Sequence, residues 1–339
     1  MQLRDAINLA ASVVPRNTTL PALSCLALRA DGRSITAIGS SIELGIEVTA
    51  ALDSQAFEVC VDADKLKQAI TAMPEATITV ADGKMLVRQG RSRATIPVMP
   101  YEQHPGMPDT SKATTGIEAD IWSLVEKVAF AAGKNDVRFF LNGVSVESDG
   151  TQLVAAASDG HRMAIARREV ELPVFSIIVP IKNIKTLLSI RPESFAVGNC
   201  IVGTRKDVRI YSKLIEGKFP DWRRLMVKHE RELQADTKAL RDALKTVKPF
   251  SHAQYLGARL TWTNKALTIK TANAEQAESQ VEIDAMADSD GEIGVNIVYL
   301  EEALATIKGE DTAIQYADAN TSLRIDDDGL THIVMPMRL

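Results

Sequence analysis

The pattern of apolar positions switches between helical and strand periodicity in a fixed order at the start of the chain. Apolar residues recur at helical spacing in segments 2–14 and 62–73. Between and after these segments lie β-branched, partly alternating runs such as SITAIG, IELGIEVTA and KMLVR. Turn signals, among them Asp31-Gly32 and Asp82-Gly83, separate the runs. The first third of the chain therefore predicts helix, strands, helix, strands.

The same order of elements returns twice. Helical patterns at 118–132 and 181–190 frame the second round, and patterns at 236–248 and 297–307 frame the third. The predicted apolar faces are Leu3, Ile7, Ala10 and Val14; Leu66, Ile70 and Met73; Ile121, Leu124, Val125 and Val128; Ile181, Ile184 and Leu188; Leu240, Leu244 and Val247; and Leu300, Leu304 and Ile307.

The nearly constant offset between the rounds predicts three equivalent α+β domains. Their expected limits are 1–111, 112–228 and 229–339. Each domain has two helices and several short strands, so the helix pair is expected to cover one face of antiparallel sheet.

Composition places the chain among ordinary globular proteins. Hydrophobic residues make up 45%, charged residues 24%, and the mean hydropathy is -0.03. No apolar run approaches the roughly 20 residues that span a bilayer, and the start of the chain lacks the layout of a secretory signal. We therefore expect a cytoplasmic protein. Cys25, Cys60 and Cys200 are odd in number and far apart, which predicts buried thiols and neither a disulfide framework nor a cysteine-rich metal site.

Charge is distributed unevenly. The net charge of -5 excludes a uniformly basic surface that coats DNA, and 5% aromatic residues are few for a protein that stacks single-stranded bases. One helix nevertheless carries a basic stripe at i, i+3, i+7 and i+10, formed by Lys238, Arg241, Lys245 and Lys248. Weaker pairs occur on three other predicted helices: Lys65 and Lys67, Lys127 and Lys134, and Lys182 and Lys185. For any one helix, the alternative remains that the basic face is only solvated and has no partner. Because basic residues recur on several helices, a shared surface that contacts phosphates without reading sequence is favoured.

Catalytic signatures are few. The sequence holds no phosphate-binding glycine loop, dinucleotide fingerprint, zinc-protease motif or nucleophile elbow. Ser158, Asp159 and His161 could form a hydrolytic set, but residues this close in a turn do not converge on one reacting atom, so an Asp-Gly turn between two strands is favoured. Residues 326–329, Asp-Asp-Asp-Gly, lack the closing glutamate of a calcium loop and predict a hairpin turn. We expect no catalysis, no metal and no cofactor.

Several longer motifs together point to a family. They are TLPAL at 19–23, DVRFFLNG at 136–143, SDGHRM at 158–163, GKFPDWRR at 217–224 and the terminal VMPMRL at 334–339. With these motifs the chain resembles the bacterial sliding clamp, the β subunit of DNA polymerase III. The resemblance implies a three-domain DNA clamp fold and a head-to-tail homodimeric ring, with helices lining a hole that holds duplex DNA. A closed ring needs only weak, sequence-independent attraction to DNA and acts as a processivity factor.

The resemblance also implies a cleft between the second and third domains. This cleft would bind short peptides of the DNA polymerase III alpha subunit, of other polymerases and of the clamp loader delta subunit. Methionine suits a groove with several partners, and arginine can bind peptide carbonyl or carboxylate groups. Carried over by position, the expected peptide-binding residues are Leu141, Ser158, Gly160, His161, Arg162, Met163, Pro220, Arg224, Leu225, Met335, Pro336, Met337, Arg338 and Leu339.

The expected DNA-binding residues combine the basic helices with positions matched to the family. They are Arg16, Asn17, Lys127, Lys134, Asn135, Lys182, Lys185, Lys238, Arg241, Lys245 and Lys248. The chain departs from the family at several of the matched positions. Asn17 occupies a position where the family often has a DNA-contacting arginine, with Arg16 one step earlier, and Asn135 replaces a longer amide.

Further departures affect both expected surfaces. Phe139 and Phe140 stand where tyrosines are common, and the polar Asn320 occupies a cleft position in the third domain. The chain also starts almost at its first helix, which predicts either a first domain without the family's usual edge strand or a true start upstream. These differences leave an alternative open: an accessory, phage or plasmid-type clamp-like adaptor that binds partners without closing into a ring.

Overall fold

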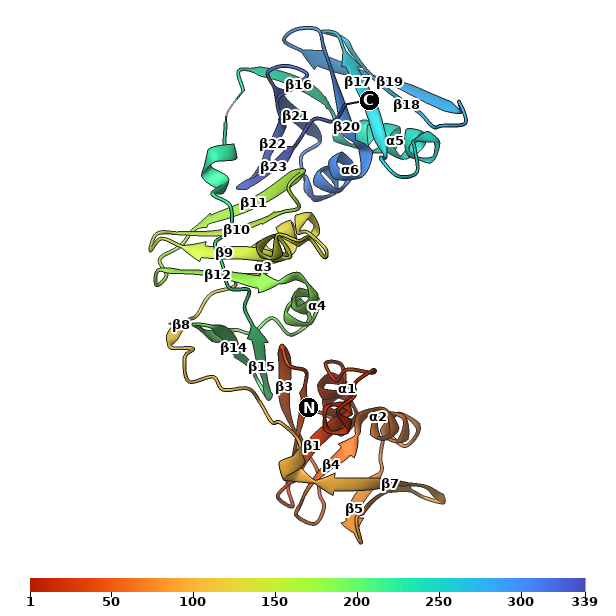
Figure 1. Cartoon of the computed structure of the whole chain (residues 1–339), viewed down its shortest axis with the longest axis vertical. Helices are drawn as coiled ribbons and strands as arrows, with labels where there is room; N and C mark the ends of the chain where they lie inside the picture. The colour runs from red at the N-terminus through yellow and green to blue at the C-terminus, as the bar shows by residue number, and fades with distance from the viewer. Residues whose placement is uncertain (228, 339) are drawn as a thin grey trace. The chain divides into compact units, whose positions relative to one another are not determined.

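The computed structural model describes residues 1–227 and 229–338. Contacts divide the chain into two compact units (Figure 1). Unit 1 comprises Met1–Asp120 and Asn183–Leu214, and unit 2 comprises Ile121–Lys182 and Ile215–Leu339. Each unit is built on one large sheet, and the strand pairs within both sheets are antiparallel, as predicted.

The sheet of unit 1 has 11 strands in the order β5-β6-β7-β4-β1-β2-β3-β15-β14-β13-β8. The strands are β1 Cys25–Ala30, β2 Ser34–Ser40, β3 Leu44–Ala51, β4 Phe57–Asp62, β5 Thr77–Ala81, β6 Lys84–Gln89, β7 Ser92–Pro100, β8 Thr115–Ile117, β13 Ser194–Val197, β14 Cys200–Arg205 and β15 Val208–Lys213. Strands of the first and second rounds join where β3 pairs with β15, with Ile46 opposite Ile210.

Two helices of unit 1 cover its first-round strands. Helix α1 (Leu3–Ala11) packs on β2 and β3, and α2 (Ala63–Ala72) packs on β1, β4 and β7; the two helices also contact each other. The carboxylate of Asp62 caps α2 by accepting a hydrogen bond of 2.8 Å from the Lys65 amide. The predicted faces are buried, except that α1 ends at Ala11 and leaves Val14 outside the helix. Pro15 disfavours helical backbone at Val14, which explains the earlier end.

The sheet of unit 2 has 12 strands in the order β12-β9-β10-β11-β23-β22-β21-β16-β19-β18-β17-β20. The strands are β9 Gly143–Ser148, β10 Gln152–Ser158, β11 Arg162–Glu169, β12 Phe175–Pro180, β16 Arg231–Asp236, β17 Gly257–Trp262, β18 Ala266–Ala272, β19 Glu278–Ala287, β20 Gly291–Asn296, β21 Asp311–Tyr316, β22 Leu323–Asp327 and β23 Leu330–Val334. Second-round and third-round strands join where β11 pairs with β23, with Met163 opposite Ile333.

The helices of unit 2 pack on this sheet. Helix α3 (Trp122–Val128) lies on β10 and β11. Helices α5 (Thr237–Val247) and α6 (Ile297–Thr306) contact each other over the third-round strands (Figure 1). The Asp236 carboxylate caps α5 and the Asn296 side chain caps α6. The predicted apolar residues Leu240, Leu244 and Val247 join Leu300 and Leu304 in one core.

The second round departs most from the prediction. Of the helix expected at 118–132, only α3 forms: residues 118–121 after β8 are not helical, and the chain beyond Val128 tightens into a 3-10 turn, Ala129–Ala131. Helix α4 (Ile181–Ile190) has the predicted bounds, but it buries Leu187, while the predicted Leu188 is only half-buried. The strands of this round are also shared between the two sheets.

Several local predictions are confirmed. Asp82-Gly83 and Asp328-Gly329 have positive φ and form two-residue hairpin turns between paired strands. All three cysteines are buried free thiols. No helix within the described residues is long and apolar enough to cross a membrane.

Candidate functional site

The loop between β10 and β11 is fixed by its own side chains. Ser158 Oγ donates a hydrogen bond of 2.7 Å to the Arg162 carbonyl and accepts one of 3.0 Å from the Gly160 amide. The Asp159 carboxylate accepts from the amides of His161 at 2.9 Å and Arg162 at 3.1 Å. This is the predicted Asp-Gly turn between strands. Because the single proton of the Ser158 hydroxyl goes to a carbonyl, the geometry gives no support to a hydrolytic set.

Arg138 supports the loop from outside. Its guanidinium forms an ion pair of 2.8 Å with Asp136 and donates to the Asp159 carbonyl at 3.2 Å. The hydrogen bonds from Arg138 lower the pKa of Asp136 to about 2. Gly160 has φ +89°, and a Cβ there would lie 2.6 Å from Nη2 of Arg138. The glycine therefore provides both the turn and the room for this guanidinium.

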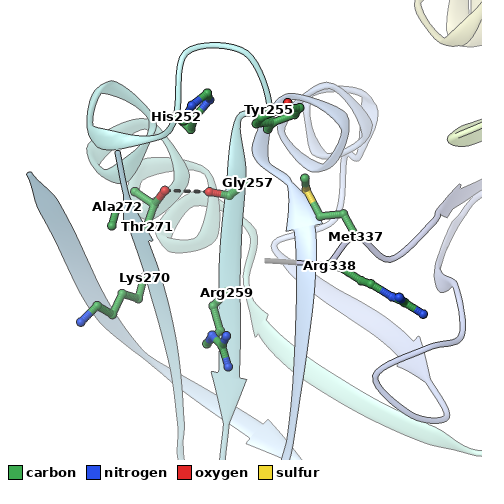
Figure 2. Close-up of a pocket in the computed structure, with 9 residues that line it drawn as sticks. All are labelled: His252, Tyr255, Gly257, Arg259, Lys270, Thr271, Ala272, Met337 and Arg338. Carbon is green, nitrogen blue, oxygen red and sulfur yellow. Dashed lines mark hydrogen bonds between the residues drawn. The ribbon is translucent and has the colours of Figure 1, made fainter. Parts of the chain in front are cut away.

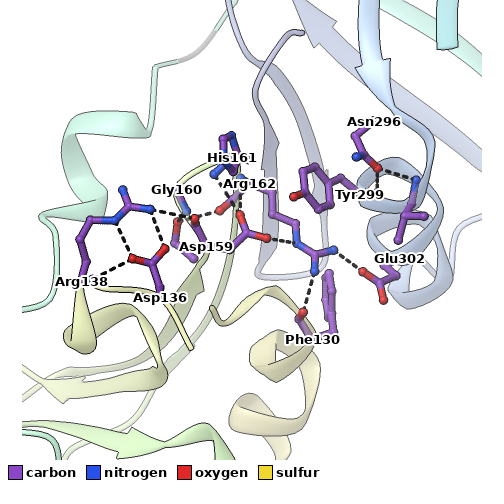
Figure 3. Close-up of polar contacts among 12 residues, drawn as sticks. Phe130, Asp136, Arg138, Asp159, Gly160, His161, Arg162, Asn296, Tyr299 and Glu302 are labelled. Atoms are coloured by element: carbon purple, nitrogen blue, oxygen red, sulfur yellow. Dashed lines mark hydrogen bonds and ion pairs between the residues drawn. The ribbon is translucent and has the colours of Figure 1, made fainter. Parts of the chain in front are cut away.

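Arg162 is held inside unit 2 by groups from several elements (Figure 3). Its guanidinium pairs with Asp159 at 3.1 Å, pairs with Glu302 of α6, and donates to the Phe130 carbonyl at 2.8 Å. The guanidinium also lies 4.5 Å from the ring centre of Tyr299. The side chain is only 10% exposed. Arg162 thus joins β11 to α6, and its expected contact with a peptide stays a prediction.

The exposed surface beside Arg162 is aromatic. The His161 ring stacks on Tyr299, with centroids 6.4 Å apart and planes at 16° (Figure 3). Asn296 Oδ1 accepts hydrogen bonds from the amides of Val298 and Tyr299, so the cap fixes the first turn of α6 that carries this tyrosine. Burial raises the pKa of the Tyr299 hydroxyl. Sequence reasoning missed Tyr299 and Glu302; their position just after a capping asparagine was the available signal.

Apolar residues expected to line the cleft divide into buried and exposed groups. Leu141 and Met163 are 2% and 3% exposed and belong to a core with Phe219 and Trp222. They are buried beneath the exposed residues of the expected cleft, and their contact with a peptide stays a prediction. Around them, Pro220 is half-buried, Leu225 is 40% exposed, and Arg224 is exposed beside Asp221.

The end of the chain is fixed at two points. The Met335 amide donates to the His161 carbonyl at 2.9 Å, and the Met337 amide donates to the Gly294 carbonyl of β20 at 2.8 Å. Met335 and Arg338 are exposed, and Pro336 and Met337 are half-buried. The structure thus brings this tail together with His161 and Tyr299; Leu339 lies outside the described residues. Asn320 is exposed in the loop before β22, whose Leu323 pairs with Val334 ahead of the tail.

Only part of the predicted basic stripe along α5 is exposed for contact with a ligand, because two of its four side chains bind groups within the protein. Arg241 donates to the carbonyls of Leu304 and Ile307 and so closes the end of α6. Lys248 pairs with Glu301. Lys238 and Lys245 are 86% and 64% exposed, and both lie near the carboxylate of Asp242, at 2.9 and 3.9 Å. Lys238 and Lys245 are therefore the residues of the stripe best able to contact phosphates.

The remaining predicted DNA-binding residues lie in both units. Arg16, Asn17 and Lys185 are exposed in unit 1. In unit 2, Lys134, Asn135 and Lys182 are exposed and Lys127 is half-buried. Asn135 has φ +60°, a left-handed backbone conformation that asparagine tolerates well. Within the described residues, no group of histidine, cysteine and carboxylate side chains is arranged to hold a metal ion.

Comparison with known proteins gives matches over the whole chain. Three family models match in order: the DNA polymerase III beta subunit N-terminal domain at residues 1–108, its central domain at 118–221 and its C-terminal domain at 224–338. The beta sliding clamp of Pseudomonas aeruginosa is 31% identical over 99% of this chain and 98% of its own length. That of Escherichia coli is 30% identical over 95% of this chain and 93% of its own length.

Solved structures agree. The chain is similar to the DnaN sliding clamp (DNA polymerase III subunit beta) from Pseudomonas aeruginosa bound to griselimycin, with a TM-score of 0.92, 31% identity, and coverage of 99% of this chain and 97% of that one. The Caulobacter crescentus pol III beta structure, at 24% identity and a TM-score of 0.92, shares the fold. The resemblance and the three-domain clamp fold predicted from the motifs are confirmed. This chain belongs to the DNA polymerase III beta subunit family, the beta sliding clamps.

Proposed function

We propose that the chain is a DNA polymerase III sliding clamp, which encircles duplex DNA and tethers the replicative polymerase as a processivity factor. The observation that carries the proposal is the match of all three beta-subunit domain models, in order, from residue 1 to residue 338. The proposed domains are 1–111, 112–228 and 229–339. The family relatives are clamps by name, and the proposed place of action is the cytoplasm.

Two incompletely paired strands favour a head-to-tail ring. Residues 92–97 of β7 pair with β6 on one side, while β4 pairs on the other side only from Val98 onward. Residues 278–284 of β19 pair with β18, while β16 on the other side pairs only from Ala285 onward. Each strand therefore leaves part of one edge without a ladder partner among the described residues. Such edges pair readily with another chain.

The charges on the two edges are complementary. Arg91 and Arg93 are exposed at the β7 edge, and Glu278, Glu282 and Asp284 are exposed along β19. Because one edge belongs to unit 1 and the other to unit 2, joining them between copies gives a head-to-tail contact. Two such contacts close a homodimer. This complementarity favours the ring over the adaptor that does not close.

Duplex DNA is the proposed ligand of the ring. Lys238 and Lys245 supply exposed charge suited to sequence-independent phosphate contacts. The exposed residues Arg16, Asn17, Lys134, Asn135, Lys182 and Lys185, with the half-buried Lys127, are proposed to add to this surface.

Partner proteins are proposed to bind beside the tail. The DNA polymerase III alpha subunit, other polymerases and the clamp loader delta subunit would insert a short peptide against His161, Tyr299, Leu225 and the tail residues Met335 to Leu339. The fixed loop and the buried Arg162 keep these surfaces in place, which reduces the ordering cost of binding. In this proposal the protein is a binding scaffold with no catalytic step of its own.

Retention on circular DNA tests the proposal. The chain is loaded by a clamp loader onto nicked circular DNA, separated from free protein, and then released by cutting the circle. We expect a dimer by light scattering and protein that stays on circles but leaves linear DNA. A monomer at micromolar concentration, or equal retention on circles and linear DNA, would contradict a closed ring.

A further inference from the structure

A separate cavity in unit 2 lies next to the tail (Figure 2). Its volume is about 510 Å³. The lining comes from the loop before β17, from β17 and β18, and from the tail: His252, Tyr255, Gly257, Arg259, Lys270, Thr271, Ala272, Met337 and Arg338. Of these, only Met337 and Arg338 were among the expected peptide-binding residues.

The two ends of this cavity differ in chemistry. At one end, Tyr255 is 57% exposed and stacks on His252 with ring centroids 4.8 Å apart, and Met337 lies at the side. At the other end are the cations Arg259 and Lys270 on neighbouring strands (Figure 2). No carboxylate side chain is among the lining residues described. The cavity therefore suits a segment with an aromatic or aliphatic group next to a negative charge.

Two carboxylates outside the cavity lining, Glu292 and Glu278, pair with its cations but leave them able to bind a negatively charged ligand. Arg259 pairs with Glu292 at 3.1 Å, with the two side chains 49% and 56% exposed, and Lys270 pairs with Glu278 at 2.8 Å, with 45% and 62% exposed. Exposed ion pairs contribute at most about 1 kcal/mol each. A ligand carboxylate can replace Glu292 or Glu278 at small cost.

Hydrogen bonds connect the cavity to the candidate peptide site. Asn296 Nδ2 donates to the Tyr255 carbonyl at 3.2 Å, while Oδ1 of the same side chain holds the amide of Tyr299 at 3.3 Å. The tail runs from its bond with His161 to its bond with Gly294, and its next residue, Arg338, lines the cavity. The cavity and the candidate peptide site therefore adjoin, since they share the Asn296 side chain and the tail.

We propose that this cavity is a second docking pocket for partner peptides, which binds an acidic segment with an adjacent aromatic residue that flanks the motif held at His161 and Tyr299. The proposal rests on the proposed function, since it assumes a partner peptide at the tail. It adds a preference among partners: peptides with acidic residues beside the motif should bind the chain more tightly than peptides with neutral residues there.

Fluorescence anisotropy tests the pocket with labelled peptides. One carries the clamp-binding motif of a bacterial replicative polymerase alone; others add Tyr-Glu-Asp at either end, or the amide version Tyr-Gln-Asn. We expect one acidic extension to tighten binding about fivefold, the effect of roughly 1 kcal/mol. Arg259→Glu should abolish this gain and leave the motif-only affinity unchanged. Arg259 is preferred to Lys270, because Lys270 pairs with Glu278 on the proposed ring edge.

Lys265→Glu is the matched control, because this exposed lysine lies at the other end of the β17–β18 hairpin. Equal affinities for acidic and amide extensions, or the same loss in both variants, would overturn the pocket while leaving motif binding intact.

A second readout needs no motif. With ¹³C-methyl methionine in the full chain, the Met337 signal should shift on adding the free acetylated peptide Tyr-Glu-Asp, and the shift should be absent in Arg259→Glu. A Met337 signal that moves with a duplex oligonucleotide and not with this peptide would overturn the proposal in favour of a nucleic-acid contact. Failure of the motif peptide to bind, by contrast, counts against the proposed function.

Discussion

The Met335 amide donates a hydrogen bond of 2.9 Å to the carbonyl of His161. One residue belongs to the last segment of the chain and the other to the loop between β10 and β11, so the bond joins the tail to second-round structure. It continues the pairing of β23 with β11 by one step beyond Arg162 opposite Val334. The tail is therefore an extension of the sheet, and Met335 is fixed beside the loop that carries His161.

The Arg162 ion pairs should contribute unequally to stability. Arg162→Gln leaves the 17% exposed Asp159 carboxylate without its charged partner and should cost about 3 kcal/mol. Glu302→Gln should cost no more than about 1 kcal/mol, because Glu302 is 42% exposed. Urea unfolding followed by tryptophan fluorescence measures both, since all three tryptophans lie in unit 2. Equal losses would contradict the role of Arg162 as the central support.

Gly160 should matter more for binding than for stability. Gly160→Ala and Gly150→Ala both place a side chain at positive φ, at +89° and +108°, and each should cost about 1–3 kcal/mol. Only the first displaces Arg138, whose flexible end can move away from the Asp159 carbonyl. Partner-peptide affinity, measured by anisotropy, should fall for Gly160→Ala and stay unchanged for Gly150→Ala. A loss in both variants would show a general effect on folding.

The basic stripe should separate into two functions. Replacing Lys238, Arg241, Lys245 and Lys248 together by Ala should weaken DNA retention. The slope of log affinity against log salt concentration should also fall, by the equivalent of up to about four phosphate contacts. Within that set, Lys238→Ala with Lys245→Ala should carry most of the change in slope. Arg241→Ala should instead destabilise the fold, since its bonds close α6. Retention measured across a salt series decides this, and an unchanged slope in the lysine pair would contradict their placement at DNA.

His332 predicts a loss of stability in mild acid. Its ring is buried, bonded at 2.7 Å to Thr306 Oγ1, and burial lowers its pKa to about 4 from the usual 6.5. Because the unfolded chain takes up this proton first, stability is complete above pH 6.5 and falls as pH drops towards 4, by up to about 3 kcal/mol. Urea midpoints between pH 7 and 4.5 should fall less steeply in His332→Gln. Parallel curves for both proteins would exclude His332 as the cause.

Local patterns predicted the local structure well. Helical spacing identified all six helices of the described chain, because an amphipathic helix must place apolar residues on one side. The hairpin at Asp328-Gly329 followed from backbone preferences of those two residues. The predicted limits of α3 were wrong at both ends: residues 118–121 follow β8 and are not helical, and Ala129–Ala131 form a 3-10 turn.

Long-range relationships could not be predicted in this way. Nothing in the local pattern of β11 or β23 indicates that Met163 pairs with Ile333, since the alternation of residues in a strand does not specify which other strand pairs with it. Likewise, the sequence shows Arg241 as one member of a basic stripe, and only the packing of α5 on α6 reveals the carbonyls that it binds. The tail was assigned through the family resemblance, since a chain end is by default frayed.

The central claim is that the fixed tail completes a partner-binding site, and peptide binding tests it most directly. A fluorescent peptide with the clamp-binding motif of a bacterial replicative polymerase is titrated with the full chain and with a chain lacking Met335 to Leu339, while light scattering records the dimer. The account predicts saturable binding to the full chain, loss of binding on truncation, and an intact dimer in both. Normal binding by the truncated chain, or none by the full chain, would contradict it.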